Sequence, residues 1–214
     1  MTDPSRLVVL HLDTERGWRG GERQALWLAR SLADRGHVSI VAARSGEPLA
    51  QRAADAGLTV VPCAPGFEFD PVAVLKLRAA ILRRSVGIVH AHTGHAVALA
   101  ALATLGTGAK TVVTRRVAFK LRSNYGSRWV YGRAHAIIAI SSAVANALVA
   151  SGIPADRVEI VPSGIDLTRE FSRATAATLA QLGVSAGQPL VVQVAQIDAS
   201  KDPLTFVRAV HAAR

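Results

Sequence analysis

The 214-residue chain is long enough to bury a full hydrophobic core, and half of its residues are hydrophobic, yet no apolar run approaches the roughly 20 residues of a membrane span. The net charge of +10, from 25 basic and 15 acidic residues, favours an anionic partner. Only five per cent of the residues are aromatic, and the sequence lacks the basic–aromatic interleaving that single-strand binders use for base stacking, so nucleic acid is not the expected partner.

Short apolar runs alternate with helix-like segments along the whole chain. The predicted strands are residues 7–12, 38–42, 58–61, 87–90, 110–114, 136–140, 158–161 and 190–195. The predicted helices are residues 22–35, 48–56, 71–84, 96–105, 127–132, 142–151, 174–182 and 202–213. This alternation predicts βαβ units, and therefore an α/β fold with a doubly wound parallel sheet.

A turn cluster near residue 165 divides the chain. We expect residues 1–165 to form a Rossmann-like N-terminal domain, residues 166–188 a linker, and residues 189–214 the opening of a second domain. About two dozen residues are too few to bury a core of their own. We therefore expect the second domain to be truncated.

Gly20 and Gly21 stand where the first predicted strand passes into the first helix. Glycines let a backbone approach a ligand closely, and the free N–H groups of a helix start favour an anion. The spacing is not the dinucleotide motif Gly-x-Gly-x-x-Gly, so an ordinary dehydrogenase is not indicated. A ligand-binding loop and a plain tight turn both remain open.

Three histidines, His90, His92 and His95, follow the fourth predicted strand. Ligands gather at the carboxyl ends of parallel strands, so His92 and His95 are candidates for positioning a substrate or handling a proton. Zinc is disfavoured because no cysteine or carboxylate accompanies the histidines, and we expect no metal site. A loop-tying role remains equally open for His90.

Other polar groups also follow predicted strands. Arg115 and Arg116 offer forked donors that match phosphate or carboxylate, although a solvated surface pair is an alternative. Ser141 is a candidate substrate-binding residue and equally a plausible cap of the helix that follows it. Lys201 stands just before the last predicted helix, where it can meet a phosphate at the helix start.

Taken in order, these segments resemble the amino-terminal half of a family 4 glycosyltransferase of two-domain GT-B architecture. The matching segments are Gly20-Gly21-Glu22-Arg23, Val89-His90-Ala91-His92, Val112-Val113-Thr114, Ile140-Ser141-Ser142, Val161-Pro162-Ser163-Gly164-Ile165-Asp166, and residues 194–203. The Pro162 to Asp166 segment is the most specific single match. The order of the motifs is more specific than any one of them.

The resemblance implies retaining transfer of a sugar from a nucleotide-diphosphate donor to an acceptor, a cell-envelope glycan or a lipid-linked molecule. It implies that the N-terminal domain holds the acceptor, while the Gly20-Gly21 backbone and Lys201 stabilise the departing diphosphate from two sides of a cleft. No metal or other cofactor is then required. A single cysteine, Cys63, fits a reducing cytoplasm, and the basic charge suits peripheral attachment to the inner face of an anionic membrane.

Some positions depart from the family pattern. The arginine that pairs with the lysine is Gln196 here, and Arg115 and Arg116 replace a histidine that often follows this strand. The arginine pair suggests an anionic acceptor. The paired acidic residues around the donor sugar would lie beyond Arg214, so we expect this chain alone to be inactive.

Two further functions remain alternatives at this point. One is a nucleotide-sugar epimerase of the same architecture, which would need carboxylates and histidines in the cleft for acid–base work. The other is a basic, non-catalytic module that binds anionic lipid or nucleic acid.

Overall fold

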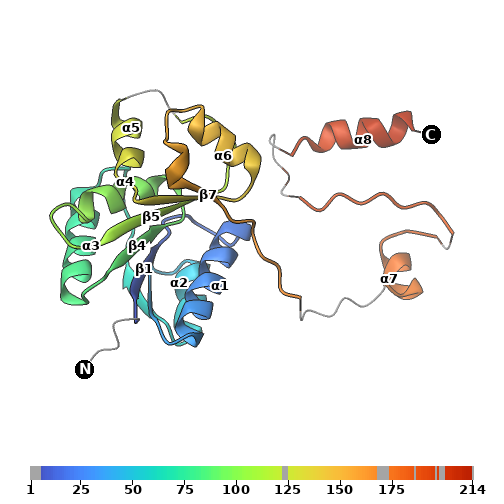
Figure 1. The fold of residues 1–214 in the computed structure, drawn as a ribbon. Coiled ribbons are helices and arrows are strands. Elements are labelled where there is room, and N and C mark those ends of the chain that lie inside the picture. Colours follow the sequence, from blue (N-terminus) through green and yellow to red (C-terminus); the bar gives the residue numbers. More distant parts are fainter. Residues whose placement is uncertain are drawn as a thin grey trace. The chain divides into compact units, whose positions relative to one another are not determined.

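The computed structural model describes residues 6–121, 125–167, 174–185, 187–195, 197 and 201–213 (Figure 1). By its contacts the chain divides into two units, Met1–Ile165 and Asp166–Arg214. None of the helices in the described ranges has the length and apolarity needed to cross a bilayer. Gln196, the departure noted at the diphosphate motif, lies outside the described residues.

The first unit is built on a sheet of seven strands that all run parallel. Its strands are β1 (Val8–Leu12), β2 (Val38–Ala43), β3 (Thr59–Pro62), β4 (Ile88–Ala91), β5 (Lys110–Arg115), β6 (Ala136–Ala139) and β7 (Val158–Ile160). Their order across the sheet is β3-β2-β1-β4-β5-β6-β7. The order reverses between β1 and β4, which is the place where open α/β sheets bind ligands. The predicted doubly wound parallel sheet is confirmed.

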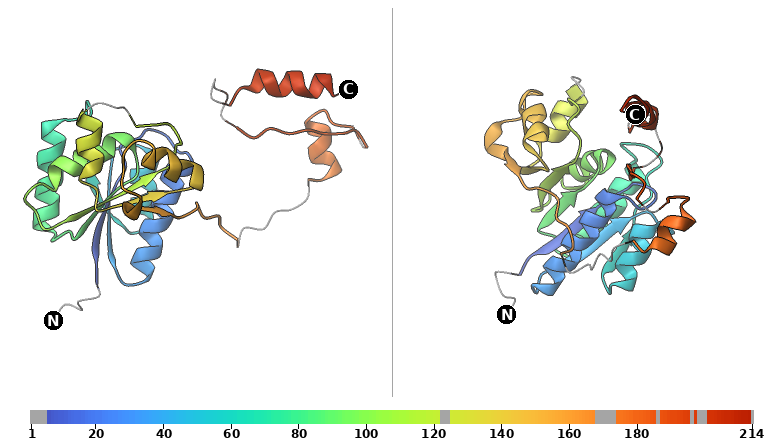
Figure 2. Two further views of the ribbon diagram at one scale, coloured as in Figure 1. Left: turned by 45° about the horizontal axis from the view of Figure 1, so that its top comes forward. Right: turned by 90° about the vertical axis from the view of Figure 1, so that its right-hand side faces the viewer.

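Helices cover both faces of this sheet (Figures 1 and 2). They are α1 (Gly20–Asp34), α2 (Pro48–Asp55), α3 (Pro71–Arg83), α4 (Gly94–Ala103), α5 (Tyr125–Gly132) and α6 (Ser142–Val149), with a 3₁₀ turn at Ala155–Arg157. A core cluster with Leu26, Val41 and Leu49 joins α1 and α2 to one face. A larger cluster, which includes Leu10, Leu99 and Leu148, packs the four helices α3, α4, α5 and α6 against the other face.

Alanine content explains the depth of burial of α4. Seven of its ten residues are buried, and five of those seven are alanine. Small side chains on every side let neighbouring helices and the sheet approach this helix closely. Thr93 caps it by accepting a hydrogen bond from the Ala96 N–H. This cap fixes where β4 ends and α4 begins.

The second unit contains the helices α7 (Ala176–Gln181) and α8 (Pro203–Ala212). The strand predicted at residues 190–195 is wrong, because these described residues are not in a sheet. A strand exists only where a neighbour completes its hydrogen-bond ladder, and no described segment pairs with this one. Its apolar side chains are accordingly exposed, Val194 to 95%.

Candidate active site

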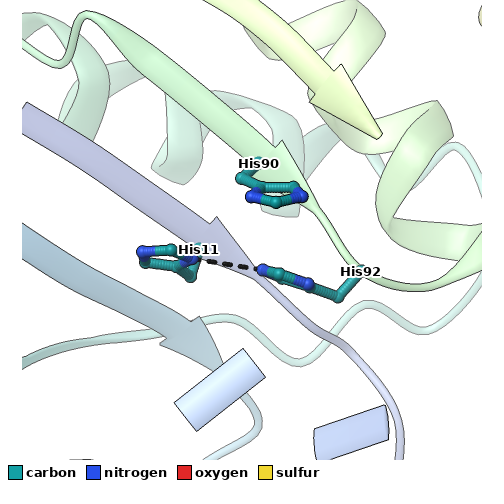
Figure 3. Close-up of side chains that lie close together, drawn as sticks. All are labelled: His11, His90 and His92. Carbon is teal, nitrogen blue, oxygen red and sulfur yellow. Dashed lines mark hydrogen bonds between the residues drawn. The ribbon is translucent and has the colours of Figure 1, made fainter. Parts of the chain in front are cut away.

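Strand register brings two histidines together in the middle of the sheet. His11 on β1 pairs directly with His90 on β4, and paired residues of parallel strands point to the same face. His92 follows β4, and its backbone N–H donates to the Leu12 carbonyl at 2.9 Å. All three imidazoles are buried and lie side by side (Figure 3).

The three imidazoles form a hydrogen-bonded and stacked group. His11 Nδ1 lies 3.2 Å from His92 Nε2, and the His90 ring stacks on the His92 ring with centroids 4.1 Å apart. His90 Nε2 is 2.7 Å from the Thr114 hydroxyl on β5. Burial lowers the pKa of His11 to about 4 and that of His90 to about 3, and it holds the pKa of His92 well below the usual value. The imidazoles are therefore neutral at pH 7.

One possible ligand atom from each of these histidines lies within 4.8 Å of the other two, which is close enough for the three residues to bind one metal ion. A metal is held in the plane of each imidazole, where the nitrogen lone pair points. The His90 ring instead presents its face to His92, with only 29° between the ring planes. Ring stacking and hydrogen bonding describe the arrangement of these imidazoles, and the absence of a metal stays an expectation.

This cluster predicts an acid-sensitive fold. The pKa of each histidine is lower in the folded chain than its ordinary value of 6.5, so the free energy of unfolding should fall as the pH drops below 6.5. A shift from 6.5 to about 4, as at His11, corresponds to about 3 kcal/mol at full protonation. Urea unfolding between pH 8 and pH 4.5 measures the slope. His11→Gln should flatten it, and the exposed His95→Gln should not; equal slopes in all three proteins would contradict the assignment.

Asp13 lies just past the end of β1, on the same edge of the sheet. Its side chain is buried, Oδ1 accepts the Glu15 N–H at 3.0 Å, and Oδ2 has no partner. Burial raises the pKa of Asp13 to about 6, and the charge of Glu22 adds to this, while the Glu15 N–H and Arg116 oppose it. A buried carboxylate oxygen without a donor is an open acceptor position.

Unpartnered buried atoms concentrate around this point. Five such side-chain atoms occur among the described residues: His11 Nε2, Asp13 Oδ2, Ser39 Oγ, His92 Nδ1 and Arg116 Nε. Four of them belong to the strand ends of β1, β4 and β5. Buried polar atoms are ordinarily satisfied, so a cluster of open ones marks a place where water or a ligand completes the bonding.

Arg116 connects this cluster to the amino end of α1. Gly20 and Gly21 are the first two residues of α1, and the Glu22 carboxylate accepts the Arg19 N–H at 2.6 Å. A Cβ on Gly21 would touch the Arg116 side chain at 3.6 Å, so this arginine runs across the glycine. Burial lowers the pKa of Arg116, and the negative charges of Asp13 and Glu22 raise it. His92, Gly21 and Arg116 are thus brought together as predicted site residues.

Substitution of Gly20 tests whether a glycine is needed at this position for the fold or for ligand binding. A Cβ built there meets nothing within 4 Å, and the position needs no left-handed backbone. Gly20→Ala should therefore leave the free energy of unfolding unchanged or raise it by up to about 1 kcal/mol, since alanine favours helices. If a diphosphate approaches this backbone, the same change should raise the donor KM several-fold. Gly132→Ala, at the end of α5, is the matched control; a destabilised Gly20→Ala chain would contradict this interpretation.

Two other predicted site residues have structural partners. Arg115 points to the opposite face of β5, where it donates to the Tyr131 hydroxyl at 2.9 Å and to the Phe119 carbonyl at 2.8 Å. Ser141 caps α6 by accepting the Val144 N–H at 3.4 Å. The structure therefore gives each of them a role in holding loops and helix ends.

The remaining predicted residues lie apart from this cluster. His95 is exposed in the first turn of α4, whereas His90 and His92 are buried. Lys201 belongs to the second unit, just before α8. Its approach to Gly20 and Gly21 stays a prediction.

The segment after β7 is tied to α1 beside the glycine loop. The Gln24 side chain donates to the Gly164 carbonyl at 2.6 Å and accepts the Gly164 N–H at 3.1 Å. This two-point bond holds the most specific of the matching motifs against the helix that begins at Gly20. It fixes where the chain leaves the first unit.

Sequence reasoning missed His11, Asp13 and Glu22. His11 is the one ionisable residue in the run of residues 7–12, and Asp13 follows it directly. A charged residue immediately after a buried strand and before a glycine loop was the available signal. Glu22 had the signal of an acidic residue at the third position of a helix.

Comparisons with known proteins bear on this geometry. The model of Glycosyltransferase Family 4 matches residues 18–169, which is most of the chain and includes the α1 start and the Gly164 segment. The chain belongs to glycosyltransferase family 4. Over 120 residues it is 34% identical to the D-inositol 3-phosphate glycosyltransferase of Nocardia farcinica, covering 55% of this chain and 25% of that protein.

Solved structures show the same fold. A glycosyltransferase from Rickettsia africae superposes with a TM-score of 0.80 at 19% identity, covering 98% of this chain and 58% of its own. Anabaena HepE in complex with UDP-glucose gives a TM-score of 0.69 at 17% identity, covering 83% and 50%. The family 4 chain thus spans a quarter to somewhat more than half of the length of these proteins.

Proposed function

We propose that the protein transfers a sugar, with retention, from a nucleotide-diphosphate donor to an anionic acceptor bound beside Asp13, His92 and Arg116. The observation that supports this most is the group of four unpartnered buried polar atoms at the ligand-binding edge of the sheet. Family membership supplies the reaction class, and a structural neighbour was solved in complex with UDP-glucose.

In this mechanism the residues of the first unit bind and orient the acceptor. Asp13 Oδ2 accepts a hydrogen bond from an acceptor hydroxyl next to the reacting one, and Arg116 pairs with the acceptor's anionic group. His92 is neutral and offers Nδ1 to a second hydroxyl. These atoms are buried in the free chain, so acceptor binding has to expose them.

Transfer then exchanges one C–O bond for another. The bond between the anomeric carbon and the diphosphate breaks, and its electron pair leaves with the diphosphate. The acceptor oxygen forms the new bond on the same face, and its proton passes to the diphosphate. Backbone N–H groups at Gly20 and Gly21 and the Lys201 ammonium stabilise the departing charge, and no metal takes part.

We further propose that the acceptor is a cell-envelope glycan precursor or a lipid-linked molecule, used at the cytoplasmic face of an anionic membrane. The net charge of +10 supports such a surface. Epimerisation on the same architecture is the weaker alternative, since the matching family model is that of glycosyltransferases.

A transfer screen tests the proposal on the product of the complete reading frame. Labelled UDP-glucose and other nucleotide sugars are offered with D-inositol 3-phosphate, chosen because a curated relative is named for it, and with anionic phospholipid vesicles. A glycosylated product whose anomeric configuration matches the donor supports the proposal. Epimerised donor without any product, or the opposite configuration, would overturn it.

A further inference from the structure

Helix α3 carries an apolar stripe on its solvent side. The side chains of Val72, Leu75 and Leu82 are 58%, 65% and 56% exposed. Their spacing of three and seven residues places them on one face of the helix. Phe67, in the segment before α3, is 64% exposed. An apolar stripe of this length on a water-facing helix indicates a surface that binds something.

Charge on this helix has a single sign. Residues 71–84 include four cations, Lys76, Arg78, Arg83 and Arg84, and no acidic residue. Arg78 donates to the Leu105 carbonyl after α4. Lys76, Arg83 and Arg84 are exposed, and Arg83 Nε donates to the Ala79 carbonyl of the same helix at 3.2 Å. Asp70, the acidic residue nearest to α3 in the sequence, caps the amino end of the helix by accepting hydrogen bonds from the N–H groups of Val72 and Ala73.

A hollow of about 600 Å³ lies between α3 and the open edge of the sheet at β3. Val60, Val61 and Ala80 line it with apolar surface, and Lys76, Arg83 and Arg84 line it with cations. Among the residues that the structure describes, no carboxylate lines it. An apolar groove with cationic walls fits a molecule that is itself amphiphilic and anionic.

We propose that α3 and this groove form a docking surface for anionic phospholipid. The exposed stripe enters the boundary between headgroups and acyl chains, and the three cations pair with lipid phosphates at the same level. Charge complementarity favours a lipid surface over a second copy of the chain, because two such faces would bring six cations together. This assignment rests on the anionic membrane partner proposed above and names the residues that would contact it.

Flotation of the 214-residue chain with vesicles tests the assignment. Vesicles of phosphatidylcholine with about 40 mol% phosphatidylglycerol should bind the chain, and vesicles of phosphatidylcholine alone should not. Lys76→Glu with Arg83→Glu should weaken binding by about tenfold or more, since each cation near an anionic surface contributes on the order of fivefold. Leu75→Ser with Leu82→Ser should leave binding that is abolished by about 0.5 M salt.

The matched control changes the net charge of the chain by the same amount, at residues outside α3. Arg30→Glu with Arg128→Glu reverses two exposed cations on α1 and α5, and binding should stay within about twofold of the wild type. An equal loss in this control would overturn the surface and indicate diffuse charge. Competition by millimolar inorganic phosphate, or dimerisation that Leu75→Ser abolishes, would overturn it in favour of a free anion or a second copy. A wild-type chain that ignores anionic vesicles overturns the membrane partner itself.

Discussion

Arg116→Ala should lower kcat/KM for the acceptor by about 10- to 100-fold in the complete enzyme, mainly through a higher acceptor KM. Arg116 lies across Gly21, with Nε buried and unpartnered, next to the charges of Asp13 and Glu22. A charge-assisted hydrogen bond contributes about 1.5–3 kcal/mol, which is the origin of that range. Initial rates at varied acceptor and fixed, saturating donor give the value.

The neighbouring arginine separates binding from folding. Arg115→Ala loses the bonds to the Tyr131 hydroxyl and the Phe119 carbonyl, so its main effect should be a loss of about 1 kcal/mol in the free energy of unfolding. Arg128→Ala, an exposed cation on α5, should change neither quantity. Unchanged acceptor kinetics in Arg116→Ala, or an equal rise in KM in all three variants, would count against the binding role of Arg116.

Asp13→Asn should stabilise the fold at neutral pH and weaken activity at the same time. Because the pKa of Asp13 is raised from 3.8 to about 6 in the folded chain, the ionised carboxyl destabilises the fold above pH 6 and not below pH 4. The difference corresponds to at most about 3 kcal/mol at pH 8. An amide cannot accept the hydroxyl's hydrogen bond as strongly as a carboxylate, so kcat/KM should fall by about tenfold or more.

Urea unfolding of the wild type and Asp13→Asn at pH 8 and pH 4 measures this difference. The gain in stability should be present at pH 8 and absent at pH 4. Glu159→Gln, which removes an exposed carboxyl on β7 that is not among the groups acting on Asp13, is the control and should not reproduce this gain at pH 8. A stability difference that is the same at both pH values would show that ionisation of Asp13 is not its source.

Element identity followed from local patterns in the first unit. The strand that ends at Ala91 and the helix that follows were predictable because an apolar run precedes a threonine cap and an alanine-rich segment. The strand at residues 190–195 was not predictable in this way. An apolar run is a strand only when another strand completes its hydrogen bonds, and that condition is not written in the run itself.

The site was less predictable because it depends on strand order. His11 and His92 lie 81 residues apart and meet only because β1 is inserted between β2 and β4. Alternation of strands and helices does not specify that order. Arg115 and Arg116 look equivalent in the sequence, but successive residues of a strand end point to opposite faces, so only Arg116 reaches Gly21.

The central claim is that an acceptor completes the open bonding positions of Asp13, His92 and Arg116. The most direct measurement is the ¹H–¹⁵N resonance of the Arg116 Nε–H group, assigned by its loss in Arg116→Lys. D-inositol 3-phosphate is the first probe, followed by whichever acceptor the transfer screen identifies. The account predicts that this resonance shifts and exchanges more slowly with water when the acceptor binds. An acceptor that is turned over by the enzyme while the Arg116 resonance stays unchanged would contradict it.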